Sequence, residues 1–199
     1  MTEDFRATGD RIRRCWPAPN ASAEMLAYHD DEWGVPVHDD RKLHEFIVLD
    51  AFQAGLSWAV VIRKREAFRE AFDNFDPERM ARFTPARINR LTRDPGIIRN
   101  RLKIAASVTN ARSLLAIQDE FGSFDRFIWQ FVEGKTVHNH WKTLKQIPAR
   151  SRQSDRMSEA LYDRGFKFVG STICYAFMQA AGMVNDHLVG CRRHAELGG

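Results

Sequence analysis

The clearest periodic pattern of apolar residues along the chain lies between Asp40 and Ala54. Apolar side chains recur there with the 3.6-residue spacing of a helix, at Leu43, Phe46, Ile47 and Ala54. Asp50 falls inside the same apolar stripe. An ionised carboxylate in such a position is costly unless it is paired or hydrogen-bonded, so Asp50 is a candidate functional residue. A capping or ion-pairing role is the structural alternative.

Turn signals divide the chain beyond this helix. Gly55 is expected to end the helix, and Ser57 to cap a second one that extends from Trp58 to about Phe72. Two further helices are expected to begin at Asp76-Pro77 and Thr84-Pro85, because proline is favoured at the first helical position. The pattern therefore predicts a series of short helices.

A tight glycine turn follows at Asp94-Pro95-Gly96, and a new helix continues through RNRLKIAASVTNA (99–111), with Lys103 among the basic residues just beyond the turn. A helix that begins at such a turn directs its free backbone N–H groups outward, which suits them to hold a phosphate. A helix-hairpin-helix that grips the DNA backbone without reading sequence would have this pattern, and an ordinary helical corner is the alternative. The residues assigned to this DNA contact are Gly96, Ile98, Arg99 and Arg101.

The second half of the chain also reads as helix. Residues 113–134 are expected to be helical with an aromatic cluster in the core, and residues 135–154 have no clear period and many basic side chains, so they are expected to form an exposed excursion. A helix is expected to start at Ser154 or Ser158 and end near Tyr162, and an apolar stretch of helix length runs from Ile173 to Met183. No strand pattern is convincing. The prediction is an all-α domain over residues 13–199, preceded by a flexible, polar segment at 1–12.

Composition narrows the class of protein. A length of 199 residues suits one domain, and 44% apolar with 28% charged residues is ordinary for a globular protein. Lysine and arginine outnumber aspartate and glutamate by 30 to 26, which permits a nucleic-acid partner without requiring one. Three cysteines argue against a disulfide framework, and no stretch resembles a secretory signal or a membrane span. We therefore expect a cytoplasmic protein without membrane association.

Cysteine and histidine spacing raises the question of a metal. His187 and Cys191 are four residues apart, so on a helix they would share a face and could bind one ion together. A closed zinc site takes four nitrogen or sulfur ligands, and Cys15 with His29 would complete a set that joins the two ends of the chain. The alternative is a buried Cys191, a solvated His187 and a surface Cys15. Sequence spacing alone does not decide between the metal site and this alternative.

Four stretches taken together resemble the DNA-3-methyladenine glycosylase I family. They are AYHDDEWGVP (27–36), QAGLSW (53–58), DPGIIRNRLKI (94–104) and RGFKFVGSTICYAFMQAAGMVNDHLVGC (164–191). The similarity extends from about Cys15 to Cys191. It implies an all-helical member of the helix-hairpin-helix glycosylase superfamily. It also implies one structural zinc per chain, held by Cys15, His29, His187 and Cys191.

The resemblance implies hydrolysis of the N-glycosidic bond of 3-methyladenine in alkylated DNA, as monofunctional base excision repair. The partner would be double-stranded DNA containing alkylated purines, bound by a nucleoid-associated monomer. Such a base must be swung out of the duplex, and because N3 alkylation makes it cationic, tryptophan and tyrosine faces attract it by roughly 0.5–2 kcal/mol per ring. The implied catalytic residue is Asp50, and the implied substrate-binding residues are Trp16, Tyr28, Trp33, Gln53 and Trp58.

Two residues depart from the family pattern. Asp50 stands where characterised members have glutamate, which keeps the charge and loses one methylene of reach, and Met25 stands where a stacking tyrosine is expected. These departures define the alternative function, a non-catalytic or differently specific lesion- or DNA-binding relative of the same fold. A zinc hydrolase is disfavoured, because four protein ligands would leave no open position for water on a tetrahedral zinc.

Overall fold

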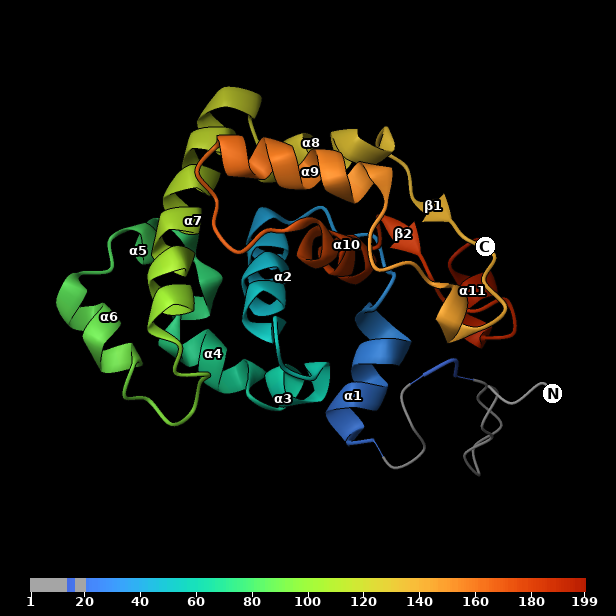
Figure 1. The fold of residues 1–199 in the computed structure, drawn as a ribbon, viewed down its shortest axis with the longest axis horizontal. Helices are drawn as coiled ribbons and strands as arrows, with labels where there is room; N and C mark the ends of the chain where they lie inside the picture. Colours follow the sequence, from blue (N-terminus) through green and yellow to red (C-terminus); the bar gives the residue numbers. More distant parts are fainter. Residues whose placement is uncertain (1–13, 17–20) are drawn as a thin grey trace.

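The computed structural model describes residues 14–16 and 21–199, and the segment 1–12 that the sequence predicts to be flexible lies outside the described residues. Helices dominate the described chain (Figure 1). The α-helices are α1 (Ala23–Ala27), α2 (Asp40–Gln53), α3 (Trp58–Arg63), α4 (Arg65–Ala71), α5 (Pro77–Ala81), α6 (Pro85–Leu91), α7 (Arg101–Phe121), α8 (Phe124–Trp129), α9 (Arg152–Asp163), α10 (Ser171–Ala180) and α11 (Arg192–Glu196). A π-helix, η1 (Tyr28–Glu32), and three 3-10 turns, η2 (Asp73–Phe75), η3 (Gln130–Val132) and η4 (Leu144–Gln146), complete the helical elements.

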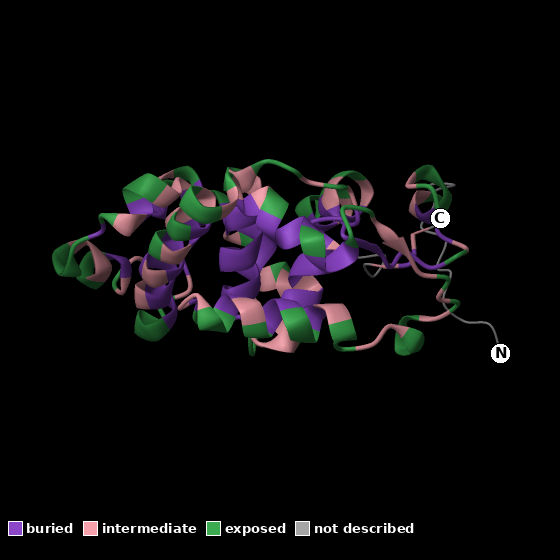
Figure 2. Cartoon of the chain, turned by 90° about the horizontal axis from the view of Figure 1, so that it is seen from above, coloured by how far each residue is buried: buried purple, intermediate pink, exposed green. Residues whose placement is uncertain are grey.

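Helix α2 occupies the centre of the molecule, with α7, α8 and α10 packed around it (Figure 1). Every residue from Leu43 to Phe52 is buried, so this helix is enclosed on all sides and not only along the predicted stripe. Figure 2 shows the buried residues concentrated in this central region. A helix enclosed in this way must carry any polar side chain into the core.

Two hydrophobic clusters meet at α2. Phe46 and Ile47 belong to the cluster formed mainly with the C-terminal half of the chain, whereas Leu49 and Phe52 belong to the cluster formed mainly with α4 to α7. Trp58 packs against both clusters. Asp50 therefore projects from the one helix that both halves of the core share.

Several local predictions are confirmed. The chain leaves α2 through Gly55 with φ of 86°, a backbone conformation that glycine adopts at little cost. Helices α5 and α6 begin at Pro77 and Pro85, and the preceding Asp76 and Thr84 side chains accept hydrogen bonds from main-chain N–H groups of the first turn. Turn chemistry thus set these boundaries.

Other boundaries differ from the predictions. The helix expected over 58–72 is divided at Lys64 into α3 and α4. The helical region expected over 113–134 is the end of a long α7, which Gly122 terminates, followed by α8 and η3. Helix α9 begins earlier than predicted, because Ser151 and Ser154 cap each other across its first turn.

Two segments predicted without regular structure contain short helices or a short strand, while residues 135–153 are exposed or half-buried, as predicted. The stretch 15–40 is rich in proline, asparagine and aspartate, a composition that predicts an irregular segment, yet it contains α1 and η1. The excursion at 135–154 contributes strand β1 (Val137–His138), which pairs in parallel with β2 (Val184–Asn185), so the absence of strands was predicted wrongly. Pairs of two residues are too short to show an alternating pattern in sequence.

Among the described residues, no helix is both long and apolar enough to cross a membrane.

Candidate functional site

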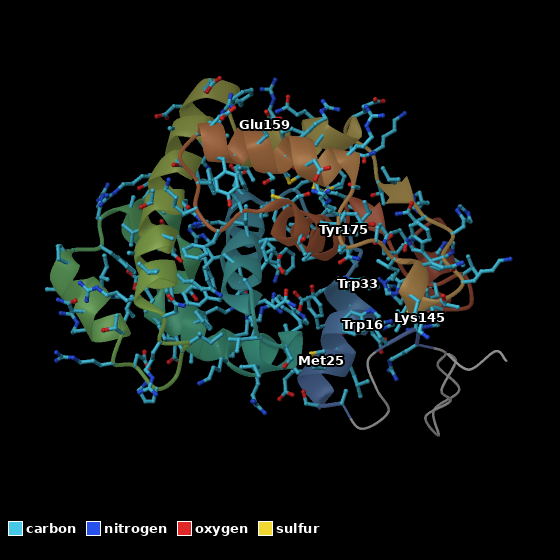
Figure 3. All side chains as sticks on the ribbon, viewed as in Figure 1. Trp16, Met25, Trp33, Lys145, Glu159 and Tyr175 are labelled. Atoms are coloured by element: carbon cyan, nitrogen blue, oxygen red, sulfur yellow. The ribbon has the colours of Figure 1, made fainter. Side chains whose placement is uncertain are left out.

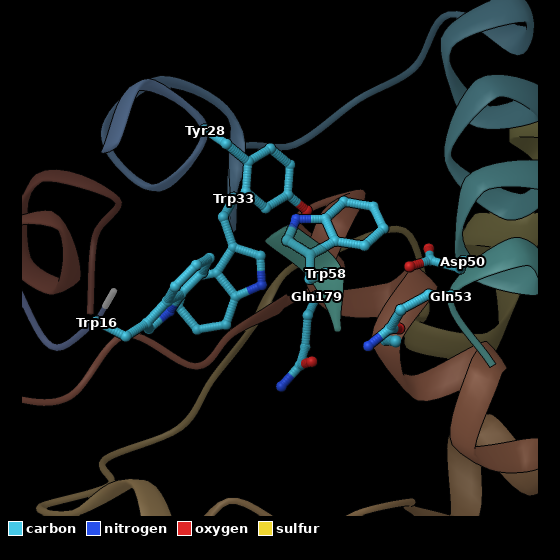
Figure 4. Close-up of a pocket in the computed structure, with 8 residues that line it drawn as sticks. Trp16, Tyr28, Trp33, Asp50, Gln53, Trp58 and Gln179 are labelled. Carbon is cyan, nitrogen blue, oxygen red and sulfur yellow. The ribbon is translucent and has the colours of Figure 1, made fainter. Parts of the chain in front are cut away.

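A cavity of about 210 Å³ lies between η1, α2, α3 and α10 (Figure 4). Its lining contains all six side chains that the sequence assigns to catalysis and base binding, together with two that the sequence analysis missed. The lining residues are Trp16, Tyr28, Trp33, Asp50, Gln53, Trp58, Ala176 and Gln179. Gln179 is a polar residue inside the apolar stretch 173–183, which is the same signal that singled out Asp50.

Four aromatic side chains form one wall of the cavity. The ring centroids of Trp16 and Trp33 are 5.0 Å apart with planes at 84°, and those of Tyr28 and Trp58 are 5.2 Å apart with planes at 52°. In the view of Figure 3, Trp16 and Trp33 lie close together beside α1. Met25, at the position where the family resemblance leads one to expect a stacking tyrosine, is buried in the core and is not a lining residue. The aromatic faces therefore come from the other four positions.

Asp50 has no partner inside this cavity. Its side chain is only 2% exposed, and its Oδ2 atom forms no hydrogen bond within the described part of the chain. Burial raises the pKa of this carboxyl well above its usual 3.8, because the ionised form loses its hydration. The Nε1 atom of Trp58 is likewise buried without a partner. The cavity thus holds an acid group and an N–H donor that no described residue satisfies, which is the arrangement expected of a site built for a polar ligand.

Tyr28 shares this environment. Burial raises the pKa of its phenol well above 10, and the nearby charge of Asp50 adds to the rise. The tyrosine therefore stays a neutral O–H at physiological pH. It offers the cavity an aromatic face and a hydroxyl donor.

A buried ion network holds the π-helix that carries Tyr28. Arg65 donates to both carboxylate oxygens of Glu32, at 2.7 and 2.8 Å, and to Glu45 of α2 at 2.7 Å. Burial alone would raise the pKa of Glu32, but the hydrogen bonds and charge of Arg65, with those of Lys42, lower it to about 2. The end of η1 is therefore fixed to α2 and α4 by charge pairs that persist at neutral pH.

The predicted hairpin lies in the turn between α6 and α7, and two lysines tie this region to the helices that precede it. Lys64, between α3 and α4, donates through Nζ to the carbonyl oxygens of Pro95 (2.8 Å) and Gly96 (3.0 Å). Lys103, on the first turn of α7, donates through Nζ to the carbonyl oxygens of Phe52 (3.1 Å) and Ala54 (2.7 Å). Lys64 thus ties the turn at Gly96 to the α3–α4 junction, and Lys103 ties the start of α7 to the end of α2.

The residues at this turn differ in how exposed they are and in whether their polar groups are free to contact DNA. Arg99 is exposed, and Arg101 is exposed while donating to the Asn89 side chain at 2.6 Å. The Asn100 side chain caps α7 by accepting from two N–H groups of its first turn, so these groups do not point free to solvent as the sequence analysis expected. Lys103 faces the interior and not the outer surface. Any phosphate contact at this end of α7 falls mainly to Arg99 and Arg101.

The four candidate metal ligands, far apart in sequence, form one buried group. Their ligand atoms all lie within 4.8 Å of one another. The Cys15 Sγ atom is 3.5 Å from His29 Nε2 and 3.6 Å from His187 Nδ1, and Cys191 Sγ is 3.7 and 3.6 Å from the same two nitrogens. His187 and Cys191 lie in the turn after β2, not on a helix as their spacing suggested. The turn places the two side chains close together, as one face of a helix would also have done.

Hydrogen bonds outside the group fix the orientation of both histidines. His29 uses Nδ1 toward Asp30 Oδ1 at 2.8 Å, and His187 uses Nε2 toward the carbonyl oxygen of Trp33 at 2.9 Å. Both acceptors require an N–H, so the opposite ring nitrogens carry lone pairs. These two lone pairs face the two sulfur atoms across the same small space. The donor set therefore fits a metal ion.

Comparisons with known proteins agree with this arrangement. A sequence model of the methyladenine glycosylase family matches residues 16–194. DNA-3-methyladenine glycosylase 1 of Escherichia coli (strain K12) is 50% identical over 166 residues, which cover 83% of this chain and 89% of that protein. A crystal structure of a 3-methyladenine DNA glycosylase I is 49% identical, covers 86% of this chain and 94% of its own, and superposes with a TM-score of 0.84. A variant of a 3-methyladenine DNA glycosylase I in complex with 3-methyladenine is 34% identical, covers 86% and 92%, and has a TM-score of 0.84.

The unpartnered carboxyl predicts a stability effect. Because the folded pKa of Asp50 is raised, the unfolded chain releases this proton first, so Asp50 lowers the free energy of unfolding as pH rises above about 3.8. We expect Asp50→Asn to increase the free energy of unfolding at pH 7 by about 1–3 kcal/mol. The gain should shrink as pH falls toward 4. Denaturant unfolding of the wild type and the variant at several pH values measures it.

The matched control is Asp163→Asn, at an exposed position in the last turn of α9. It should change the free energy of unfolding by no more than about 0.5 kcal/mol at every pH measured. A loss of stability in Asp50→Asn at pH 7 would mean that the carboxylate has a partner the free protein relies on.

Proposed function

The chain belongs to the methyladenine glycosylase family, and we propose that it hydrolyses the N-glycosidic bond of 3-methyladenine in alkylated DNA at the cavity beside Asp50. The observation that carries this assignment is the buried, unpartnered oxygen of Asp50 inside an aromatic cavity. A protein that only bound DNA would have no use for such a group, which costs stability in the free state.

Recognition of the lesion follows from charge. Alkylation at N3 leaves the base cationic in DNA, and the faces of Trp16, Tyr28, Trp33 and Trp58 attract a cation through their ring quadrupoles. Neutral adenine gains much less from the same faces. When the cationic base enters, its charge favours the ionised form of Asp50 and lowers the raised pKa of that carboxyl. The ionised Asp50 then accepts a hydrogen bond from the exocyclic amine of the base.

Bond cleavage needs little more than this electrostatic support. As the bond between the sugar C1′ and the base stretches, the bonding pair moves to the base, which leaves as neutral 3-methyladenine, and positive charge builds on the sugar. The Asp50 carboxylate, which is almost fully buried, stabilises that charge. A water molecule then adds to C1′ and releases a proton to solvent, which leaves an abasic site and an intact strand.

We further propose that the turn at Gly96 binds the DNA backbone as a helix-hairpin-helix. The support is the glycine turn between α6 and α7, the exposed Arg99 and Arg101 beyond it, and the lysine hydrogen bonds that tie this turn to the α3–α4 junction and the start of α7 to the end of α2. Backbone contacts position a protein on DNA without reading its sequence. Double-stranded DNA that contains alkylated purines is therefore the proposed partner, bound by a single copy of the chain.

The metal proposed for the group at the chain ends is a structural zinc. Zinc bonds of about 2.3 Å to sulfur and 2.0–2.1 Å to nitrogen, at tetrahedral angles, place sulfur and nitrogen ligands about 3.6 Å apart. The four sulfur–nitrogen distances of 3.5–3.7 Å match this value. When bound, zinc would hold Cys15 and His29 against His187 and Cys191 and leave no position for a substrate water.

Base release by Asp50 variants tests the proposed chemistry. Asp50→Asn keeps the shape and removes the charge, so single-turnover release of 3-methyladenine from methylated DNA should fall by about 100-fold or more. Binding to undamaged DNA should be unchanged. Asp50→Glu restores a methylene of reach and should raise the rate. Equal rates for the wild type and Asp50→Asn would show that this carboxyl does no chemistry.

Metal removal tests the zinc. The purified protein should contain about one zinc per chain, and Cys191→Ser should lose both metal and several degrees of melting temperature, because metal binding contributes directly to folding. Cys174→Ser is the control: this buried thiol lies outside the group and donates to the carbonyl oxygen of Val169, a bond that serine can replace. A metal-free protein with an unchanged melting temperature after chelation would contradict the assignment.

Charge reversal tests the hairpin. Arg99→Glu and Arg101→Glu should weaken binding to damaged and undamaged duplex by the same factor and reduce its salt dependence, because each removes a phosphate contact. Arg156→Glu on α9, across the molecule from the α6–α7 turn (Figure 1), is the matched control and should leave both affinities unchanged. A loss confined to damaged DNA would place these arginines in lesion recognition instead.

A further inference from the structure

The side chain of Asp186 is a buried carboxylate held entirely by neutral donors. It is 1% exposed. Its Oδ1 atom accepts from Asn139 Nδ2 at 2.7 Å and Trp141 Nε1 at 2.8 Å, and its Oδ2 atom accepts from the Tyr175 hydroxyl and from Gln179 Nε2, both at 2.8 Å. No cation pairs with it in the described part of the chain. The carboxylate accepts all four hydrogen bonds, so it fixes the direction in which each donor group points.

This arrangement decides which end of the Gln179 amide faces the cavity. A carboxylate only accepts hydrogen bonds, so the amide nitrogen of Gln179 must point to Asp186 and the amide oxygen must point away from it. The hydrogen-bond network therefore sets an orientation that the shape of the amide alone would leave open. In Figure 4 the oxygen of Gln179 lies on the side of Gln53, and the nitrogen lies on the opposite side. Gln179 lines the cavity, and no described residue donates to its side-chain oxygen.

We propose that Gln179 determines specificity for a 6-amino purine and that Asp186 is the positioning residue that holds it in the selective orientation. The amide oxygen of Gln179 accepts one hydrogen of the exocyclic amine of the flipped base, while Asp50 accepts the other. This inference rests on the proposed base-release function and specifies which alkylated purine the cavity prefers. A 6-keto purine presents an oxygen where the amine would be, so two acceptors would face each other and neither would be satisfied.

The network also explains why the segment at 135–154 is ordered. Asn139 and Trp141 come from that segment, whereas Tyr175 and Gln179 come from α10, so Asp186 joins the segment to the helix that carries Gln179 into the cavity. Trp141 limits what can replace Asp186, because an indole N–H can only donate a hydrogen bond. Whatever replaces Asp186 must still offer an acceptor on the Trp141 side.

The test compares two lesions released by the same enzyme. Single-turnover rates are measured for 3-methyladenine and 3-methylguanine in duplex DNA, because both bases are cationic and one has an amine and the other an oxygen at the 6-position. The 2-amino group that only guanine carries is the same for every enzyme variant, so the test is the change in the ratio of the two rates relative to the wild type. Gln179→Met removes the acceptor and keeps the length of the side chain. It should lower the ratio of the 3-methyladenine rate to the 3-methylguanine rate at least about tenfold.

Asp186→Asn makes the sharper variant. The substituted amide must keep its oxygen toward Trp141 and so places its nitrogen toward Tyr175 and Gln179. Gln179 then turns to accept from it and directs its own nitrogen into the cavity. The ratio should fall by at least the factor seen for Gln179→Met, with 3-methylguanine release maintained or increased. A loss of packing alone would lower both rates together and leave the ratio unchanged.

Tyr175→Phe is the matched control, because it removes one hydrogen bond to Asp186 and leaves the Gln179 contact in place. It should lower the melting temperature without changing the ratio. Metal content is measured for Asp186→Asn because His187 is the next residue. If that variant does not fold, Gln179→Met decides. An unchanged ratio in an active Gln179→Met enzyme overturns this inference, whereas a wild type that releases no 3-methyladenine overturns the proposed function itself.

Discussion

A carboxyl group without a partner, carried into the core by a helix that is buried on every side, is the constraint on which this site depends. Leaving such a group unsatisfied costs about 1–3 kcal/mol. The burial of the two apolar clusters that meet on α2 offsets this cost. The cavity is therefore pre-organised, since the acid is already dehydrated and aimed before any base arrives.

Tyr28, one of the aromatic residues that line the cavity, is positioned by interactions on two sides. Tyr28 and His29 are consecutive residues of the π-helix η1, so one turn of backbone supplies a face of the cavity and a member of the cysteine–histidine group. Glu32, at the end of the same turn, is held by Arg65. The placement of Tyr28 thus depends on interactions with the C-terminal segment on one side and with α2 and α4 on the other. A π-turn is uncommon and often found at functional sites, which agrees with this double role.

Sequence reasoning succeeded where the determinant is local. Gly55, Pro77 and Pro85 act through their own backbone preferences, and Asp50 was visible as a polar residue on an apolar stripe. Spacing alone left the cysteine and histidine set undecided, and the family resemblance brought it together. What the sequence could not reveal are contacts between distant segments: Lys103 reads as a surface cation after a turn, yet it faces the carbonyl groups that end α2. The same holds for the β1–β2 pair and for the donors around Asp186, which become neighbours only after the chain has folded.

The hydrogen bonds of two lysines around the turn at Gly96 have a consequence for DNA binding. Lys64 reaches from the α3–α4 junction to the turn, and Lys103 reaches from α7 back to the end of α2, so each of these segments is tied to another one. A duplex seated on the turn would therefore meet a protein that does not close around it, and the distortion needed to expose a base would have to be taken up by the DNA itself. Under the proposed function, a damaged base that unstacks at low energetic cost would therefore be the one most readily exposed.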